Sequence, residues 1–311
     1  MKVLLTGAAG FAGSHIADEI VRNTDWHIVA LDALTYAGHM SNLDEVPKNR
    51  MTFICHDFAE PLPLDRVGPV DYIIHNGAET HVTNSLADPA PFIQSNVVGT
   101  FNLLEAARIL KPLKFLYTST DEVFGASLVP HKEDDPLCPS NPYSATKAAG
   151  EMLVRAYQNC FGVPCIITRT TNMFGKRQHE EKFVPMTIRK FRNRETTEIH
   201  TDAQGNFGSR QWIHASDQAS AILFLLQSSF VNSVFHVAGE RKDNAEIVTE
   251  LSRRLSFEFQ DSEYMHPWYK FVNAYKQFPG HDLHYALDDS KIRAAGWTPR
   301  LTFEQGLALT V

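Results

Sequence analysis

The sequence predicts an α/β fold, built on a doubly wound parallel sheet with a smaller, interleaved α/β region towards the C-terminus. Over about the first 170 residues, short apolar runs rich in β-branched residues alternate with segments of helical periodicity. This alternation is typical of parallel strands joined by right-handed helical crossovers. The first apolar run leads directly into a glycine-rich segment, and the second ends on an acidic residue. Together these observations favour a sheet of the Rossmann type.

The individual elements follow from local patterns. Apolar runs predict strands at 2–6, 27–31, 52–55, 72–75, 115–118 and 165–168. Longer periodic segments predict helices at 14–22, 91–110 and 143–161. After about residue 170 the alternation loosens, and the stretches 196–209 and 261–284 are polar. We therefore expect a dinucleotide-binding domain over 1–170, to which some later segments return, and a mainly substrate-binding region over 171–311.

Composition restricts the class of protein. The 311 residues are 43% hydrophobic, which is enough for a substantial core, and the formal net charge of −7 argues against a nucleic-acid or anionic-membrane surface. The longest apolar runs are too short for a membrane span, and the N-terminal run lacks the length of a signal peptide. The four cysteines show no CxxC spacing, so we expect no metal site and no disulfide framework. A cytoplasmic protein with reduced thiols is the expectation.

The glycine-rich segment has the spacing G-x-x-G-x-x-G at Gly7, Gly10 and Gly13, with Phe11 and Ala12 between the last two glycines. Glycines permit a tight turn and a close approach of the backbone to a pyrophosphate, which then faces the amides at the start of the helix. The spacing alone is a weak signal, because an ordinary glycine turn also produces it. Its position between the first strand and the first helix makes a dinucleotide site the stronger interpretation.

Two aspartates follow later strands. Asp32 ends the second strand, where a carboxylate can accept hydrogen bonds from both ribose hydroxyls of adenosine. It would repel a 2′-phosphate, and no arginine follows it closely, so the sequence favours NAD over NADP. Asp57, after the third strand, is either an adenine contact or a helix cap.

Tyr143 and Lys147 are four residues apart in a predicted helix and therefore share one face. The ammonium of Lys147 is expected to lower the pKa of Tyr143 by favouring the phenolate, which could then remove a hydroxyl proton. A buried tyrosine beside a surface lysine is the alternative. A hydroxyl-rich strand end, Thr118 to Thr120, lies about twenty-five residues upstream and makes the catalytic interpretation more specific.

Thr120, Asp121 and Glu122 form the most informative triplet. Interacting acids are driven to different pKa values, which leaves one protonated and one ionised. An elimination needs such a pair, a base for a C–H proton and an acid for the departing hydroxyl. A solvated pair of loop carboxylates is the alternative.

These motifs resemble the extended short-chain dehydrogenase/reductases, and the segment 119–125, STDEVFG, is similar to the signature of their nucleotide-sugar 4,6-dehydratases, especially dTDP-glucose 4,6-dehydratase. The segments LTYAG (34–38), AETHV (78–82), NVVGT (96–100) and PGHD (279–282) resemble that enzyme too. The resemblance covers nearly the whole chain. The Thr-Asp-Glu triplet is its most discriminating part.

The resemblance implies tightly bound NAD and a three-step reaction on a nucleoside-diphosphate hexose, with dTDP-glucose favoured. Tyr143 would deprotonate the sugar 4-hydroxyl with help from Thr120, and C4 would be oxidised. The resulting ketone acidifies the C5 proton, which Glu122 would remove while Asp121 protonates the departing 6-hydroxyl. Return of the hydride to C6 would give a 4-keto-6-deoxy sugar.

Further contacts come from the same resemblance. It implies that Ala78 and Asn96 touch the cofactor. It places Ser85 and Asn172 at the hexose or its phosphates, and Lys182, Arg210 and Asn244 at the nucleotide diphosphate. The alternative interpretations are a surface residue for Lys182 and a helix cap for Asn244.

The chain departs from the family pattern at several positions. Phe278 stands where an arginine for the diphosphate is usual, and Gln211 replaces the aspartate that usually follows Arg210. The stretch 196–208 matches the nucleotide-side loop poorly, and Phe124 replaces a tyrosine. These departures put the diphosphate and base pocket in doubt more than the hexose chemistry.

Three other functions stay open. A nucleotide-sugar 4-epimerase or a reductase that releases NADH would share the cofactor loop and the Tyr–Lys pair without needing Asp121 and Glu122. A non-catalytic NAD-binding regulator could keep the fold alone. By the same resemblance, the helices at 91–110 and 143–161 predict a homodimer through a four-helix bundle.

Overall fold

The computed structural model describes residues 1–201, 205, 207–259, 269–273 and 284–311. The strands are β1 (Lys2–Thr6), β2 (His27–Asp32), β3 (Met51–Cys55), β4 (Tyr72–His75), β5 (Lys114–Thr120), β6 (Cys165–Thr170), β7 (Asn172–Phe174), β8 (Thr197–Thr201), β9 (Ser209–His214), β10 (Ser233–Val237), β11 (Glu240–Asp243) and β12 (Tyr269–Asn273). The helices are α1 (Phe11–Asn23), α2 (Leu64–Val67), α3 (Val82–Ala87), α4 (Ala90–Ile93), α5 (Gly99–Leu110), α6 (Pro142–Phe161), α7 (Phe183–Arg192), α8 (Ala215–Gln227), α9 (Asn244–Phe259), α10 (Ser290–Ala294) and α11 (Phe303–Thr310).

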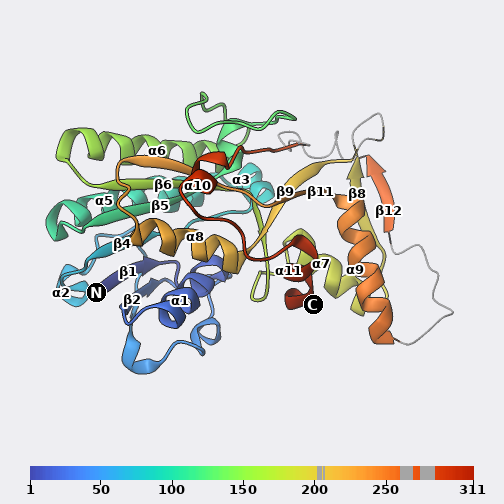
Figure 1. Ribbon diagram of the computed structural model, residues 1–311, viewed down its shortest axis with the longest axis horizontal. Helices are drawn as coiled ribbons and strands as arrows, with labels where there is room; N and C mark the ends of the chain where they lie inside the picture. The colour runs from blue at the N-terminus through green and yellow to red at the C-terminus, as the bar shows by residue number, and fades with distance from the viewer. Residues whose placement is uncertain (202–204, 206, 260–268, 274–283) are drawn as a thin grey trace.

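The central sheet contains seven strands in the order β10-β6-β5-β4-β1-β2-β3, and every neighbouring pair is parallel. The order reverses direction beside β1, because the chain moves outward from β1 to β3 and then returns to β4 on the other side (Figure 1). The doubly wound sheet predicted from the sequence is confirmed. Each of the six predicted strands is present, with ends that differ by no more than a few residues.

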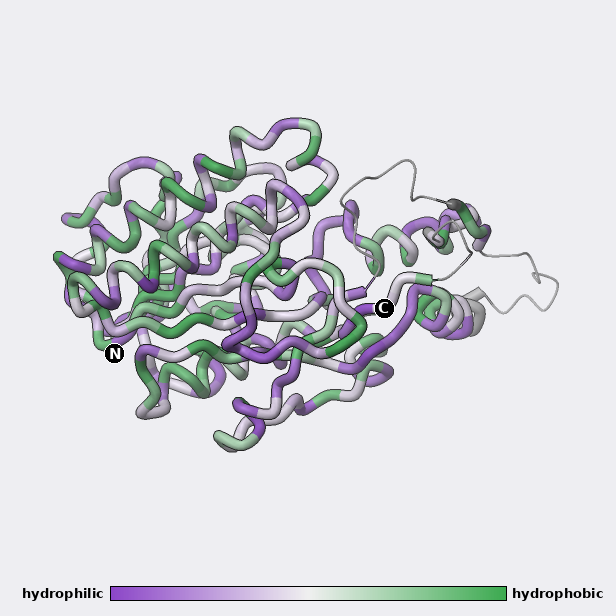
Figure 2. Tube along the Cα trace, turned by 90° about the horizontal axis from the view of Figure 1, so that it is seen from above, coloured by the Kyte–Doolittle hydropathy of each residue, from purple (hydrophilic) through white to green (hydrophobic). Residues whose placement is uncertain are grey.

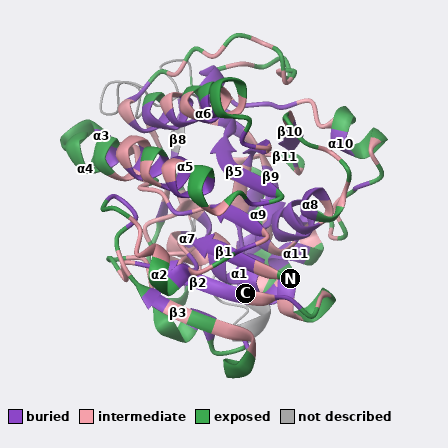
Figure 3. Ribbon diagram, turned by 90° about the vertical axis from the view of Figure 1, so that its left-hand side faces the viewer, coloured by how far each residue is buried: buried purple, intermediate pink, exposed green. Residues whose placement is uncertain are grey.

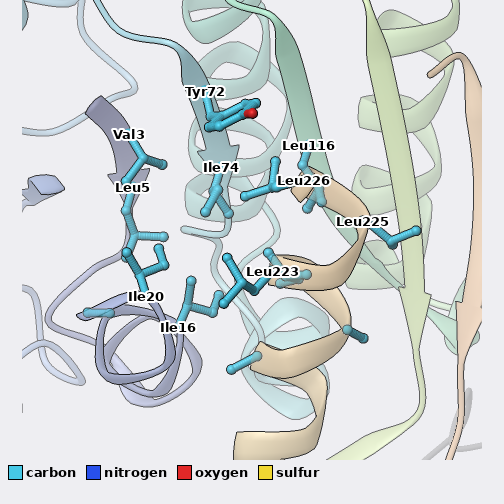
Figure 4. Close-up of a cluster of buried hydrophobic side chains, with 14 of the residues drawn as sticks. Val3, Leu5, Ile16, Ile20, Tyr72, Ile74, Leu116, Leu223, Leu225 and Leu226 are labelled. Atoms are coloured by element: carbon cyan, nitrogen blue, oxygen red, sulfur yellow. The ribbon is translucent and has the colours of Figure 1, made fainter. Parts of the chain in front are cut away.

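Helices cover both faces of this sheet. On one face, α1 packs against α8, and Ile16 and Ile20 meet Leu223 over the strand side chains Val3 and Leu5 (Figure 4). On the other face, α5 packs against α6 over the alternate strand residues, Leu4 and Ile73 among them. Burying one such aliphatic side chain contributes about 1.5–3 kcal/mol. The central strands are accordingly buried on both sides, as Figure 3 shows.

The predicted helix at 91–110 is interrupted. Its first turn is α4, the segment Gln94–Val98 is a turn of π-helix, and α5 follows. A π-turn inserts one residue into the helical repeat and turns the preceding side chains relative to the following ones. The sequence pattern gave no sign of this change of pitch. The other two predicted helices correspond to α1 and α6.

The later part of the chain builds two smaller sheets. In the first, β9 lies between β7, to which it is parallel, and β11, to which it is antiparallel. In the second, β8 pairs with β12. Helices α7, α9 and α11 enclose a separate apolar core with these strands. Strand β10 returns to the central sheet, so the chain is interleaved, and the division into 1–170 and 171–311 stays a prediction.

Within the described part of the chain, no helix is long and apolar enough to cross a membrane.

A buried ion pair fastens α6 to the sheet. The guanidinium of Arg169 on β6 donates to the Glu151 carboxylate at 3.0 Å and 2.7 Å, and both side chains are almost completely buried. Breaking a buried pair leaves an unpaired charge, so Glu151→Ala should lower the free energy of unfolding by about 3–5 kcal/mol. Arg253→Ala, which removes an ion pair between Glu250 and an exposed arginine, should change the free energy of unfolding much less. Denaturant unfolding at neutral pH measures both, and equal losses would contradict this assignment.

Candidate active site

A cavity of about 490 Å³ opens at the carboxyl ends of the central strands. Residues that directly follow or end β1, β2, β4, β5 and β6 all contribute to its wall. It lies where the strand order reverses beside β1, the position at which open parallel sheets bind their ligands. Residues 171–173, 178, 179, 181 and 182 of the later region also line it.

The glycine loop packs too tightly for larger residues. Gly7 adopts a φ of 63°, and a β-carbon there would lie 2.6 Å from the Cα of Gly77. A β-carbon on Gly13 would lie 2.0 Å from the carbonyl oxygen of Gly7. Gly10, Phe11 and Ala12 line the cavity at the start of α1, whose first-turn amides have no partner inside the helix. The loop therefore offers exposed backbone donors to an anion.

Asp32 is buried at the end of β2 and faces the cavity. Its carboxylate accepts hydrogen bonds from the amides of Ala9 at 2.9 Å and Leu34 at 2.8 Å. Each carboxylate oxygen has a second lone pair, so these bonds leave capacity for hydroxyl donors. The aspartate is thus held firmly at the edge of the glycine loop.

The other predicted cofactor residues differ in placement. Asp57 and Ala78 line the cavity, and the Asp57 carboxylate also accepts a hydrogen bond from the amide of Ala59, as a turn residue does. Asn96 lies behind the wall, where its amide bonds both the backbone N–H and the carbonyl of Glu79. Asn96 therefore shapes the loop beside the cavity, and Asp57 fits both interpretations that the sequence left open.

Tyr143 and Lys147 project from the first turns of α6 into the cavity wall. The Lys147 ammonium donates to the carbonyl of Thr118 at 2.7 Å and lies 4.3 Å from the centre of the Tyr117 ring. Burial lowers the pKa of Lys147 to about 7. For Tyr143, burial and then the charge of Glu122 raise the pKa, although a hydrogen bond with Thr120 opposes the shift. The pKa of Tyr143 is therefore raised, contrary to the expectation that Lys147 lowers it, because burial has the largest effect.

Thr120, Asp121 and Glu122 all line the cavity at the end of β5. Burial, reinforced by the charge of Glu122, raises the pKa of Asp121 to about 7. The Thr120 hydroxyl donates to Asp121 at 3.1 Å and accepts from the amide of Glu122 at 3.3 Å. One acid of the pair is thus driven towards its protonated form, as the sequence predicted. The triplet brings a hydroxyl, an acid and a second carboxylate to one point.

The predicted substrate residues separate into two groups. Asn172 and Lys182 line the cavity, and the Lys182 ammonium donates to the carbonyl of Thr80 at 3.1 Å. Ser85 is fully buried outside the lining, where its hydroxyl accepts from the backbone amide of Tyr143. Arg210 on β9 and Asn244 at the start of α9 also lie outside the lining. The structure therefore joins two of the five to the cavity, and the contacts of the others stay predictions.

Phe278 and the PGHD segment fall outside the described residues. Gln211 is described: its side chain bonds both the backbone amide and the carbonyl of Leu287. It thus ties β9 to the chain near residue 287.

Sequence reasoning missed several lining residues. Gln218 on α8 is buried, and its side-chain oxygen has no hydrogen-bond partner within the described part of the protein. The hydroxyl of Tyr36 donates to Glu181 at 3.2 Å, and both residues line the cavity although they lie 145 positions apart in the chain. No local pattern marks such long-range contacts. For Gln218, the signal was a polar residue on the apolar face of a helix.

The whole chain matches known proteins. Residues 4–310 match the family model described as GDP-mannose 4,6 dehydratase. A low-salt glycan biosynthesis protein, Agl12, of Haloferax volcanii is 38% identical over 100% of this chain and 97% of its own length. A dTDP-glucose 4,6-dehydratase of Neisseria meningitidis is 36% identical over 100% of this chain and 92% of its own.

A solved structure agrees with these relatives. The crystal structure of DesIV, a dTDP-glucose 4,6-dehydratase from Streptomyces venezuelae with NAD bound, superimposes with a TM-score of 0.90 at 33% identity. The match covers 100% of this chain and 95% of that one. The likeness therefore extends through both the central sheet and the later region.

Proposed function

The chain belongs to the GDP-mannose 4,6-dehydratase family, and from this premise we propose that it is an NAD-dependent nucleotide-sugar 4,6-dehydratase. The proposed reaction converts a nucleoside-diphosphate hexose into its 4-keto-6-deoxy form with loss of water. The observation that supports it most is the meeting of Thr120, Asp121, Glu122 and Tyr143 in one cavity. An epimerase, a reductase or a binding protein has no use for the acid pair.

The cavity suits NAD on structural grounds. The glycine loop leaves no room for β-carbons at Gly7 and Gly13, and the first-turn amides of α1 would meet a pyrophosphate. Asp32 would accept from the adenosine ribose and disfavour a 2′-phosphate. When bound, NAD would supply the acceptor for the hydride from C4 and the donor of that hydride to C6, and its positive charge would favour the phenolate of Tyr143.

The oxidation depends on Tyr143. Its hydroxyl lies against Thr120, and both side chains reach the same cavity. We assign to Tyr143 the removal of the proton from the sugar 4-hydroxyl, with Thr120 as a second hydrogen-bond partner of that oxygen. Lys147, whose ammonium is fixed by the Thr118 carbonyl, would contact the cofactor and favour the phenolate of Tyr143.

The elimination depends on the acid pair. A ketone at C4 makes the neighbouring C5 proton acidic, and Glu122 would remove it. Asp121, whose pKa of about 7 keeps a proton available near neutrality, would donate to the departing 6-hydroxyl. The different environments of the two acids thus match their different tasks.

The test is incubation of the purified protein with dTDP-glucose and UDP-glucose, followed by mass spectrometry. Loss of one water from either sugar would support the proposal and identify the preferred base, for which we favour thymidine by overall likeness. An unchanged mass with an epimeric sugar would point to a 4-epimerase. If neither dTDP-glucose nor UDP-glucose is changed, the proposal is overturned for these substrates.

We also propose a homodimer formed by α5 and α6. Figure 3 shows exposed stretches on α5 and α6, and Figure 2 shows that hydrophobic stretches alternate with hydrophilic ones along the chain. Phe101 and Ile109 on α5 are 45% and 66% exposed, and Met152 and Phe161 on α6 are 48% and 51% exposed. A patch of this kind marks an interface more often than a free surface. A partner's copy of the pair would complete a four-helix bundle.

Phe101→Glu should therefore separate the dimer, because a carboxylate would have to be buried against the partner's apolar helices. Sedimentation at micromolar concentration measures the change. Leu128→Glu, at an exposed apolar residue in the loop after β5, is the matched control and should leave the dimer intact. A monomeric parent protein would overturn the assignment.

We propose a cytoplasmic location because the cysteine thiols are free. All four cysteines are unpaired, and three of them are exposed. Exposed free thiols suit a reducing compartment.

A further inference from the structure

Asn141 precedes Pro142 and caps the helix that carries Tyr143 and Lys147. Its side-chain oxygen accepts from the Ser144 amide at 2.9 Å, while the Ser144 hydroxyl accepts from the Asn141 amide at 3.2 Å. This reciprocal arrangement is a capping box and fixes α6 at its first turn. It also determines which end of the Asn141 amide faces which neighbour.

The other end of that amide points at the acid pair. With its oxygen committed to the cap, Asn141 directs its Nδ2 donor to the Oε2 atom of Glu122, 3.4 Å away. Asn141 is only 6% exposed, so water competes little for this donor. The contact joins residues nineteen positions apart, on the turn after β5 and at the start of α6.

We propose that Asn141 is a positioning residue for Glu122. From the start of α6, the helix that carries Tyr143, its amide fixes the orientation of the Glu122 carboxylate. The proposal rests on the proposed function for the role of Glu122, but the contact itself does not. A donor bonded to a carboxylate stabilises its ionised form, which is the form a base needs. Asp121, Tyr143 and Lys182 are among the titratable groups close enough to interact with the charge of Glu122. Asn141 differs from all three because it donates without titrating.

The chemistry of helix caps makes the two tasks of Asn141 separable. Serine and aspartate cap helices about as well as asparagine, but neither offers a second N–H donor. Asn141→Ser therefore keeps the cap and removes the contact with Glu122. Asn141→Asp keeps the cap and places a like charge beside Glu122. Asn141→Ala removes both interactions.

The experiment compares these three variants as NAD-loaded enzymes with the nucleotide sugar that the parent protein dehydrates. Asn141→Ser removes a hydrogen bond to a charged group and should lower kcat about tenfold or more. KM and the formation of reduced nicotinamide should stay unchanged, and the isotope effect of deuterium at C5 should grow. Asn141→Asp should be slower still. A wild-type kcat and isotope effect in Asn141→Ser would overturn the proposal, because a capping role alone predicts that result.

A second measurement does not depend on activity. The measurement is NMR of protein with isotope-labelled asparagine. The side-chain amide signal of Asn141 is assigned by its absence in Asn141→Ser. This signal should shift as Glu122 titrates. Glu122→Gln should abolish this shift. A signal that moves identically in both proteins would show that the contact is absent and overturn the proposal. If the contact is present and no sugar is dehydrated, the failure lies with the proposed function.

Discussion

Glu122→Gln should reduce the rate of dehydration about a thousandfold, within the range usual for loss of a general base. An amide cannot accept the C5 proton, whereas the groups assigned to the oxidation, Tyr143 and Thr120, are untouched. The reaction should therefore stop after C4 oxidation. Reduced nicotinamide should accumulate on the enzyme and be visible by its absorbance within one turnover.

The matched control for this variant is Glu45→Gln, which makes the same chemical change at an exposed residue that does not line the cavity. It should dehydrate the sugar at the parent rate. If Glu122→Gln dehydrates normally, or fails already at the oxidation, the assignment of Glu122 as the C5 base is wrong.

Asp121→Asn should lower the dehydration rate about a hundredfold and make the protein more stable above neutral pH. The rate falls because an amide is a poor proton donor to the departing hydroxyl. For the same reason, the rate of the parent enzyme should decline as pH rises through about 7, where Asp121 loses its proton.

The gain in stability follows from the raised pKa. Burial lifts the pKa of Asp121 from 3.8 to about 7, so ionisation opposes folding. Stability is then highest below the unfolded pKa and is lost as pH rises towards the folded value. Asparagine has no proton to lose, so the variant should gain on the order of 2 kcal/mol over the parent at about pH 8. Denaturant unfolding across this pH range checks it, and a difference that does not grow with pH would contradict the account.

The central sheet could be predicted from the sequence because its information is local. Each strand is a short apolar run buried on both faces, and the glycine loop and Asp32 occupy fixed places after β1 and at the end of β2. The cavity residues that were found, Thr120 to Glu122 among them, come from strand ends or helix starts. Parallel topology brings such positions together without any knowledge of side-chain packing.

What could not be predicted depends on long-range packing. The π-turn at Gln94–Val98 turns Asn96 towards the loop at Glu79, a contact invisible in the periodicity. The pKa of Tyr143 rises because the residue is fully enclosed, and burial cannot be read from a Tyr–Lys spacing. The Ser85 hydroxyl accepts a hydrogen bond from the Tyr143 backbone amide, a contact between residues 58 positions apart that no local pattern marks.

In the proposed reaction, oxidation at C4 and reduction at C6 are joined within one cavity by the elimination assigned to Asp121 and Glu122. The most direct test is to supply a nucleoside-diphosphate glucose with deuterium at C4 and to locate the label in the product. The account predicts a product lighter by one water, with the deuterium at C6. A dehydrated product without the label, or an intact hexose that keeps it at C4, would contradict the claim.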